Sequence, residues 1–484
     1  TVSVMTVNRS DFQRRFKAVP DADDRFIGHD PGDGTGDPFV TDLAGLAAGL
    51  APSIATDAAL LSRFGPGGFA GNVQRLDLAE RAATSKGGSI GVGNKAVISL
   101  RFDDYHDAFQ ANILPLLIAR GLPAGFASID SRVDQPWFST TTWNQVRNWN
   151  QRGVEIWSHG HDHKDPTPDG DAGLVEQIVT SKAMLEAQGM KVQGWMQPGA
   201  TPVAPPAVPY GVDMTQIEHL YTSRAGQLIL GTYPLSCTDA LGSFRTIPTA
   251  LRHGLSHSTV SDGVSYASTT QLIDVAIRDR LALQLMCHAG KLGQPGNMTL
   301  AEFANLLDYI VAAWDAGTVE VLTPSGMMFA DRSTNRLDLF RRGDFESIST
   351  NDTNFAGWGS TFTVETTGGV SGNNFLRGTA TGAILSQRVP VLRTRLLDGE
   401  TFVFDAWARA NSSTFTTTRI LLQSYPTTTA LNLDLFHGAG ATPLTWTKVR
   451  FAFTIPPGVD ELLVGLGRTG GGGCDWDEVH VYKV

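Results

Sequence analysis

The sequence predicts an α/β fold, a distorted (β/α) barrel, followed by an all-β sandwich, with an extended N-terminal segment before both. Three observations support this prediction. Strand-like and helix-like runs alternate over residues 95–335, short alternating segments rich in Gly, Ser and Thr fill residues 336–484, and residues 1–94 contain little that could form an independent core. A length of 484 residues is typical of two to four domains.

Composition and charge narrow the class of protein. The chain is 42% hydrophobic and 18% charged, which is typical of a soluble globular protein, and its net charge is −10. There is no basic stripe and no run of 18 apolar residues, so we expect neither a nucleic-acid partner nor a transmembrane segment. The three cysteines, Cys237, Cys287 and Cys474, are too widely spaced for a metal-binding set or a disulfide framework.

The N-terminal segment is predicted to be a tether or an interface. Its Asp/Gly/Pro-rich part, DADDRFIGHDPGDGTGDPFV (21–40), is typical of loops. The Ala/Leu-rich part, 41–64, predicts one or two short helices that break near Pro52. The first residues lack the apolar core of a secretion signal, and the sequence leaves open whether a leader has been removed. We expect this segment to serve in attachment or in homo-oligomerisation, with a trimer among the candidate states.

Residues 95–335 predict parallel β/α units. The strand candidates are AVISLRF (96–102), PAGFASI (123–129), VEIW (154–157), KVQGWMQ (191–197) and LALQLMC (281–287). Between them, helix-like stretches occupy 107–121, 141–153, 173–189, 269–280 and 300–317. In the third of these, apolar residues recur at spacings of three and four and a Gly ends the run.

Residues 336–484 predict a β-sandwich, specifically a jelly roll. Turn residues separate short strand-like runs at 401–410, 419–425, 447–455, 461–468 and 477–484.

Polar side chains follow four of the predicted barrel strands at the point where each strand ends. Asp103 and Asp104 follow the first, His159 the third, Gly199 lies just after the fourth, and His288 follows the last. The carboxyl ends of parallel strands meet on one face, where active sites are built. We therefore expect these residues to lie close together.

The segment HGHDH (159–163) is the sharpest local signal. His159 and His163 are four residues apart, a spacing that on a helical turn places two imidazoles on one face. A carboxylate from Asp103 or Asp104 would complete a three-ligand site for a divalent metal with open positions. The alternative is a solvated polar loop. His161 is either a substitute ligand or a bystander.

This pattern resembles the polysaccharide deacetylases of carbohydrate esterase family 4, which have the NodB-homology fold. The resemblance covers roughly residues 95–330 and rests on RFDD, HGHDH and MCH. It implies that Asp103 is the general base, that Asp104, His159 and His163 hold zinc or another divalent transition metal, and that His288 is the general acid.

The sequence departs from the family pattern at several positions. Arg101 replaces a Thr, Gly160 replaces a Ser or Thr, and WMQPGA has Met196 where the third motif has an Arg. The Arg that orients the base is therefore missing or supplied elsewhere, with Arg101 itself as one candidate. The backbone amide at Gly199 is the candidate oxyanion group.

The C-terminal part resembles carbohydrate-binding jelly rolls, on GDFESISTNDTNFAGW (343–358) and DWDEVHVYKV (475–484). Such modules hold a structural calcium, which the resemblance places at Glu346 and Asp477. Trp358 and Trp407 are interpreted as core aromatics, with sugar stacking as the alternative. Cys287 is interpreted as a buried structural thiol, and His106, His253 and His257 as surface or loop residues.

The leading hypothesis is a metal-dependent hydrolase that removes N- or O-acetyl groups from a bacterial cell-surface or cell-wall glycan. The alternative is a glycan-binding adhesin or structural tail protein with a vestigial deacetylase domain. Residues 23–40 loosely resemble the N-termini of actinobacteriophage tail proteins, which implies a virion location with other tail proteins as partners. A secreted, extracellular enzyme is the competing interpretation.

Overall fold

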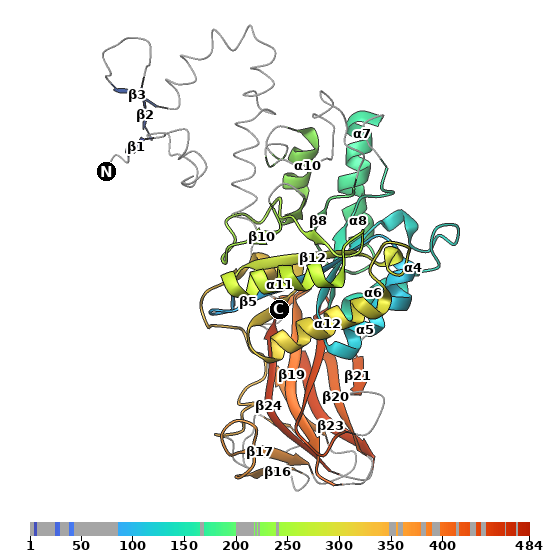
Figure 1. The fold of residues 1–484 in the computed structure, drawn as a ribbon, viewed down its shortest axis with the longest axis vertical. Coiled ribbons are helices and arrows are strands. Elements are labelled where there is room, and N and C mark those ends of the chain that lie inside the picture. The colour runs from blue at the N-terminus through green and yellow to red at the C-terminus, as the bar shows by residue number, and fades with distance from the viewer. Residues whose placement is uncertain are drawn as a thin grey trace.

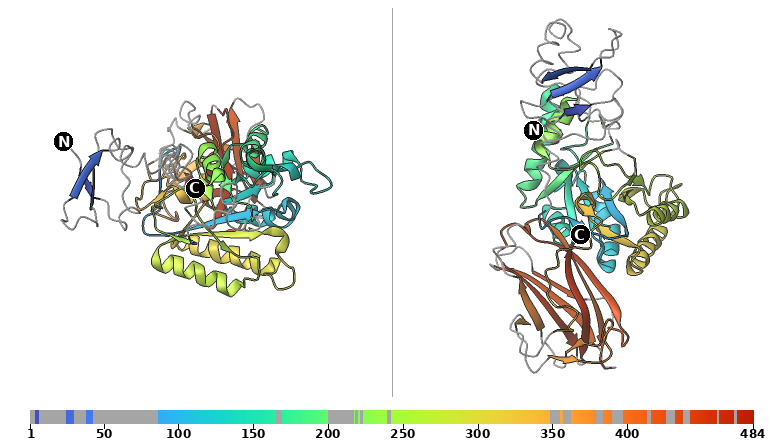
Figure 2. Two further views of the ribbon diagram at one scale, coloured as in Figure 1. Left: turned by 90° about the horizontal axis from the view of Figure 1, so that it is seen from above. Right: turned by 90° about the vertical axis from the view of Figure 1, so that its left-hand side faces the viewer.

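The computed structural model describes the chain in separate stretches. They are residues 4–6, 25–29, 38–42, 86–164, 169–199, 217, 220, 223–238, 242–347, 355–356, 362–378, 384–389, 397–412, 416–425, 432–436, 442–459, 461–470 and 473–484. A mostly parallel sheet with its helices is followed by two antiparallel sheets, and the second module lies against one end of the first (Figures 1 and 2).

Among the residues that the structure describes, three short strands precede residue 43. Strand β1 (Val4–Thr6) pairs parallel with β2 (Arg25–His29), which pairs antiparallel with β3 (Pro38–Asp42). The prediction of a loop over 21–40 is therefore wrong for β2 and for the part of β3 within it, because strand pairing uses backbone groups that composition does not report. The helices predicted over 41–64 lie outside the described residues, except that Thr41 and Asp42 belong to β3.

The first module is a distorted (β/α) barrel, as predicted. Its nine-stranded sheet has the order β10-β12-β5-β6-β7-β8-β9, with β13 paired to β5 and β11 to β12. Every residue of β5, β6, β7 and β8 is buried, as expected for parallel strands with both faces covered. The strands are β4 (Ile90–Gly91), β5 (Ala96–Asp103), β6 (Ala124–Ser128), β7 (Val154–Ser158), β8 (Val192–Met196), β9 (Ser236–Cys237), β10 (Phe244–Arg245), β11 (Ser258–Thr259), β12 (Ala282–His288), β13 (Val319–Leu322) and β14 (Ala330–Asp331).

Helices cover the faces of this sheet, and α11 and α12 lie side by side on one of them (Figure 1). Helix α12 starts at a capping box in which Thr299 and Glu302 each bond the other's backbone N–H, and α6 starts at an equivalent box. Their bounds are α4 (His106–Ala108), η1 (Phe109–Ile113), α5 (Leu114–Arg120), η2 (Asp130–Arg132), α6 (Trp143–Gln151), α7 (Gly170–Leu174), η4 (Val175–Thr180), α8 (Ser181–Glu186), α10 (Arg224–Thr232), α11 (Tyr266–Asp279), η5 (Ala289–Lys291), α12 (Leu300–Asp315) and α13 (Pro324–Met328). Among the described residues, no helix combines the length and apolar character needed to cross a bilayer.

The second module is a β-sandwich of two five-stranded antiparallel sheets, as predicted. Their orders are β15-β18-β23-β20-β21 and β16-β17-β24-β19-β22. Inward side chains such as Phe404, Leu422 and Trp476 form a core of their own. The strands are β15 (Phe355–Ala356), β16 (Phe362–Glu365), β17 (Phe375–Gly378), β18 (Ile384–Val389), β19 (Thr401–Ala410), β20 (Thr416–Tyr425), β21 (Asn432–Phe436), β22 (Thr447–Thr454), β23 (Glu461–Gly470) and β24 (Cys474–Lys483).

The two modules share a packed interface. Val403, Ala452 and Val484 of the sandwich belong to the apolar cluster of the barrel. Gly153, which comes soon after the end of α6, has a φ of +80° and lies against β22. A Cβ on this glycine would lie 2.3 Å from the Cβ of Ala452. Polar contacts join the same surfaces, since Glu400 accepts from Lys191 at 2.7 Å. The sandwich is therefore held against the barrel by apolar and charged contacts together.

Candidate functional site

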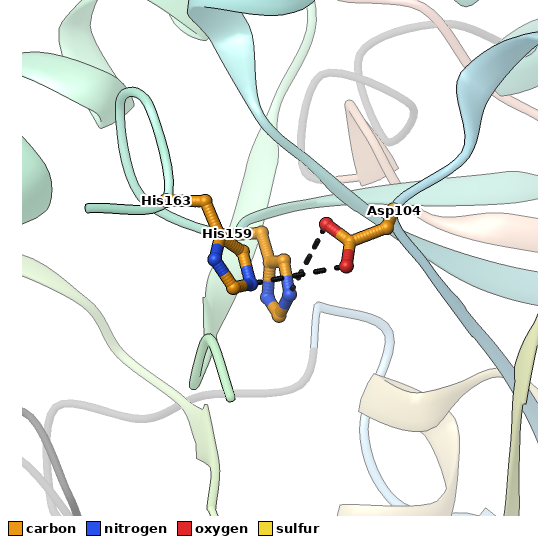
Figure 3. A group of neighbouring side chains, drawn as sticks. All are labelled: Asp104, His159 and His163. Atoms are coloured by element: carbon orange, nitrogen blue, oxygen red, sulfur yellow. Dashed lines mark ion pairs between the residues drawn. The ribbon is translucent and has the colours of Figure 1, made fainter. Parts of the chain in front are cut away.

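Asp104, His159 and His163, which we call the metal triad, come together at the carboxyl ends of β5 and β7 (Figure 3). The Asp104 oxygens lie 3.8 Å from His159 Nε2 and 3.8 Å from His163 Nε2. One ligand atom from each of the three residues lies within 4.8 Å of the others. In the described part of the chain, no other group of three or more His, Cys, Asp or Glu side chains converges in this way.

The environment of His159 leaves its Nε2 available as a ligand. Its side chain is buried, and its Nδ1 lies 2.9 Å from the carbonyl oxygen of Met196, so Nδ1 carries the proton. Burial lowers the pKa of His159, which favours the neutral imidazole that metals bind.

The backbone around the triad adopts left-handed conformations. Asp104 and His163 have φ values of 58° and 62°, although neither is glycine. Gly160 has φ 83°, and a Cβ there would lie 2.8 Å from the side-chain oxygen of Gln177. The positive φ is the main reason that glycine suits this position, where the sequence pattern led us to expect Ser or Thr; the Gln177 side chain could move to admit a Cβ, but the backbone conformation would remain strained.

The donor set fits a divalent metal. Two neutral imidazole nitrogens and one carboxylate are the ligands of an N/N/O site with open positions. The Asp104 Oδ1 atom is buried and has no hydrogen-bond partner among the described residues. A bound cation would satisfy that oxygen, since a buried carboxylate oxygen without a partner is otherwise costly.

Asp103 lies beside the triad and is paired with Arg101. The guanidinium donates from Nε to Oδ1 at 2.7 Å and from Nη2 to Oδ2 at 2.5 Å, and both side chains are buried. Burial is the largest single effect and would raise the pKa of Asp103. The charge and hydrogen bonding of Arg101, together with the charges of His159 and His257, outweigh burial and lower that pKa to about 2. Two residues apart on β5, the pair shares one face of the strand. Arg101 is therefore placed to orient Asp103, the candidate base, and this role stays a prediction.

His288 faces the same edge from the neighbouring strand. It is paired in register with Asp103 on β5, and its Nδ1 lies 2.7 Å from Asp262 Oδ2. Its backbone N–H donates to Ser261 at 3.0 Å. The sequence analysis missed Asp262, because the only signal was a Ser-Asp-Gly turn that no spacing ties to His288.

The remaining histidines differ from their predicted surroundings. His106 and His253 are buried, not on the surface, and burial lowers the pKa of each to about 4. His257 also lies inside the site, with its Nδ1 3.3 Å from Arg101 Nη1, and burial lowers its pKa to about 3. The surface interpretation was therefore wrong for His106 and His253, whereas His253 and His257 lie in loops, as the other half of that interpretation expected. His161 is no member of the triad and bonds Asp130 at 2.7 Å through Nδ1.

Four other predicted positions lie outside the group of charged residues described above. Gly199 is exposed at the end of β8, and an oxyanion role for its amide stays a prediction. Cys287 is buried, and burial raises its pKa, which suits a structural thiol. Trp358 lies outside the described residues, and Trp407 is only partly buried.

The calcium site at Glu346 and Asp477 stays a prediction. Glu346 Oε1 accepts N–H groups from Asn373 and Asn374, and Asp477 Oδ2 accepts the N–H of Val370. Both carboxylates thus accept backbone N–H groups of the same turn. Ca²⁺ needs about six to eight oxygen ligands, and these contacts supply no oxygens beyond the two carboxylates.

Comparison with known protein families identifies a match in the first module. The model of the polysaccharide deacetylase family matches residues 91–206. A search of curated proteins finds no match.

Similar solved structures include carbohydrate esterases and a binding module. A family 4 acetyl xylan esterase from Clostridium thermocellum, in complex with a cobalt ion, is 14% identical over 49% of this chain and 98% of its own, with a TM-score of 0.31. The Xyl-CE4 domain of a xylanase from the hindgut metagenome of Trinervitermes trinervoides is 15% identical over 48% and 89%, with a TM-score of 0.31. A family 16 carbohydrate-binding module is 15% identical over 26% and 89%, with a TM-score of 0.21.

The structural likenesses are distant, so the family match is the more informative comparison. Residues 91–206 match the polysaccharide deacetylase family, and they include Asp103 and the whole metal triad.

Proposed function

We propose that the protein is a divalent-metal-dependent hydrolase, with zinc as the expected metal, that removes acetyl groups from a bacterial cell-surface or cell-wall glycan. The observation that carries this proposal is the convergence of the metal triad, the Arg101–Asp103 pair and the Asp262–His288 pair at one edge of the sheet. A cation in the triad supplies Lewis-acid polarisation of an acetyl carbonyl and a lower pKa for the attacking water.

The protein's own groups handle the protons. Asp103 accepts the proton of the attacking water, and Arg101 keeps it ionised and oriented. A carboxylate with a pKa of about 2 is a weak base, so its role depends on a water that the site has made more acidic. His288, with Nδ1 held by Asp262, donates a proton from Nε2 to the leaving amine or alcohol.

Exposed aromatic side chains support a glycan as substrate. Trp137 and Phe138 are 91% and 74% exposed on the loop that follows β6, between the strands that carry the triad. Asp107, three residues after Asp104, anchors this loop by accepting from Ser139 at 2.7 Å. Exposed apolar side chains next to a catalytic edge are typical of ligand contacts, and aromatic rings stack on sugars.

The alternative function is a glycan-binding adhesin or structural tail protein with a vestigial deacetylase domain. Its main sequence argument was the missing arginine of the third motif. Arg101 reaches Asp103 with two hydrogen bonds, and this observation favours the enzyme. A location on a phage tail or outside a cell, and assembly as a homo-oligomer with other tail proteins, rest on the sequence of residues 1–94 alone.

Acetate release from acetylated host glycan, with and without a chelator, tests the enzyme proposal. We expect chelator-sensitive release and about one zinc per chain by elemental analysis. His159→Ala and His163→Ala should each lose metal and activity. Full metal occupancy in both variants would rule out the triad, and no chelator-sensitive release from any acetylated glycan would favour the adhesin.

A further inference from the structure

A large concavity lies between the two modules. This cleft, of ≈ 960 Å³, is lined by the barrel on one side and by the sheet β16-β17-β24-β19-β22 on the other. The barrel contributes Asn94, Lys95 and Trp314, and the sandwich contributes Asp405, Trp407 and Tyr482. The volume is within the range of small-molecule binding sites, about 300–1,000 Å³.

The cleft is separate from the metal triad. Its barrel residues precede β5 and β13, so they lie at the amino ends of the strands, whereas the triad lies at the carboxyl ends. Strand β5 has 8 residues, which at about 3.3 Å per residue puts the two sites roughly 25 Å apart. One small ligand cannot contact both.

Alternation along β19 places an aromatic ring on the cleft wall. Phe404, Ala406 and Ala408 are buried in the sandwich core, so Asp405 and Trp407 point to the outer face of the sheet. Trp407 is partly buried, and Lys448 Nζ lies 5.0 Å from its ring centroid. The indole is thus held in place at a wall that a ligand can reach.

The charges that line the cleft are paired with one another. Asp405 binds Lys448 and Arg450, each at 2.5 Å, and Arg450 also binds Asp315 at 2.5 Å. On the opposite wall of the cleft, Glu320 of β13 forms ion pairs with Lys95 at 2.5 Å and with Arg336 at 2.8 Å.

This pairing selects for a neutral, hydroxyl-rich ligand. Paired ions leave little net charge to attract an anion or a cation, but they are fixed donors and acceptors for hydroxyl groups. Arg336 Nη2, in addition, is buried without a hydrogen-bond partner among the described residues.

We propose that the inter-module cleft binds a neutral oligosaccharide stretch of the same glycan whose acetyl groups the metal site removes. The inference rests on the proposed function for the identity of the glycan. It differs from binding by the sandwich alone, because Asn94, Lys95 and Trp314 of the barrel form half of the wall. The cleft would hold the enzyme on the polymer while the opposite edge of the barrel acts on another stretch.

The test is calorimetric titration of the full chain with a hexasaccharide of β-1,4-linked N-acetylglucosamine. Trp407→Ala removes the ring, and Asn94→Trp fills the cleft from an exposed position on the barrel side. We expect each to weaken binding at least ten-fold. Leu444→Ala, which removes a sandwich side chain that is 59% exposed and outside the cleft, is the control and should change affinity less than two-fold.

The outcomes separate this inference from the proposed function. His159→Ala should abolish acetate release and keep the Trp407-dependent binding. If the wild type binds the oligosaccharide through Trp407 but releases no acetate from any glycan, the proposed enzyme activity is refuted and the proposed cleft is retained. Unchanged affinity in both cleft variants, or no binding by the wild type, overturns the cleft. So does sedimentation showing that Trp407→Ala converts a dimer to a monomer, since a second copy would then be the occupant.

Discussion

Replacing Arg101 by Met should damage both stability and activity, because it leaves Asp103 buried without its counter-charge. The side chains of Arg101 and Asp103 are 1% and 4% exposed and share two hydrogen bonds, at 2.7 and 2.5 Å. Removing one partner of a buried ion pair costs about 3–5 kcal/mol. At about 2–4 °C per kcal/mol, the unfolding transition of the barrel should fall by roughly 6–20 °C.

Calorimetry of the full chain measures this shift, and acetate release measures activity, which should fall about a hundred-fold to ten-thousand-fold if Asp103 no longer works as a base. The control is Arg120→Met. Arg120 pairs with Asp308 at 2.7 Å, but the Asp308 side chain is 60% exposed, so the loss should stay near 1 kcal/mol or below.

A double variant decides whether charge is the cause. Arg101→Met with Asp103→Asn removes both charges, so part of the stability lost in Arg101→Met should return, although activity should not. If Arg101→Met is no less stable than Arg120→Met, or if the double variant is less stable than Arg101→Met, the argument from a buried charge pair is refuted.

Three further predictions concern other parts of the molecule. His288→Ala should keep the metal and slow hydrolysis of N-acetyl groups far more than of activated acetyl esters, whose leaving groups need no proton; equal losses, measured as acetate release, would contradict its role as acid. The pKa of His480 is raised, to about 10 from 6.5, by Asp338 and Glu478 against the opposing effect of burial. The stabilisation from charged His480 is complete below about pH 6.5 and is lost as pH rises toward 10. The melting temperature should therefore fall more steeply with rising pH in the wild type than in His480→Gln. Because the His480 side chain is 37% exposed, solvent screening reduces the size of this difference. Gly153→Val should lower the melting temperature and speed proteolysis between the modules, because its Cβ would clash with Ala452. An unchanged melting temperature and proteolysis rate would show that the interface accommodates the side chain, which contradicts this prediction.

The sequence by itself determined the order of the modules and the edge of the sheet at which the metal triad lies. Apolar runs such as AVISLRF carry their own strand signal, and polar residues at their ends had to meet because parallel strands end on one face. The spacing of His159 and His163 was likewise local information, and the structure brings both to Asp104.

Only the tertiary structure decided which side chains complete that edge. Asp262 reaches His288, and His257 reaches Arg101, across 26 and 156 residues of chain, and no periodicity encodes such contacts. The cleft between the modules could not be predicted for the same reason. Its walls come from residues near 94, 314, 407 and 482, and they meet only because the sandwich packs against the barrel through surfaces whose apolar residues look, in sequence, like those of any core.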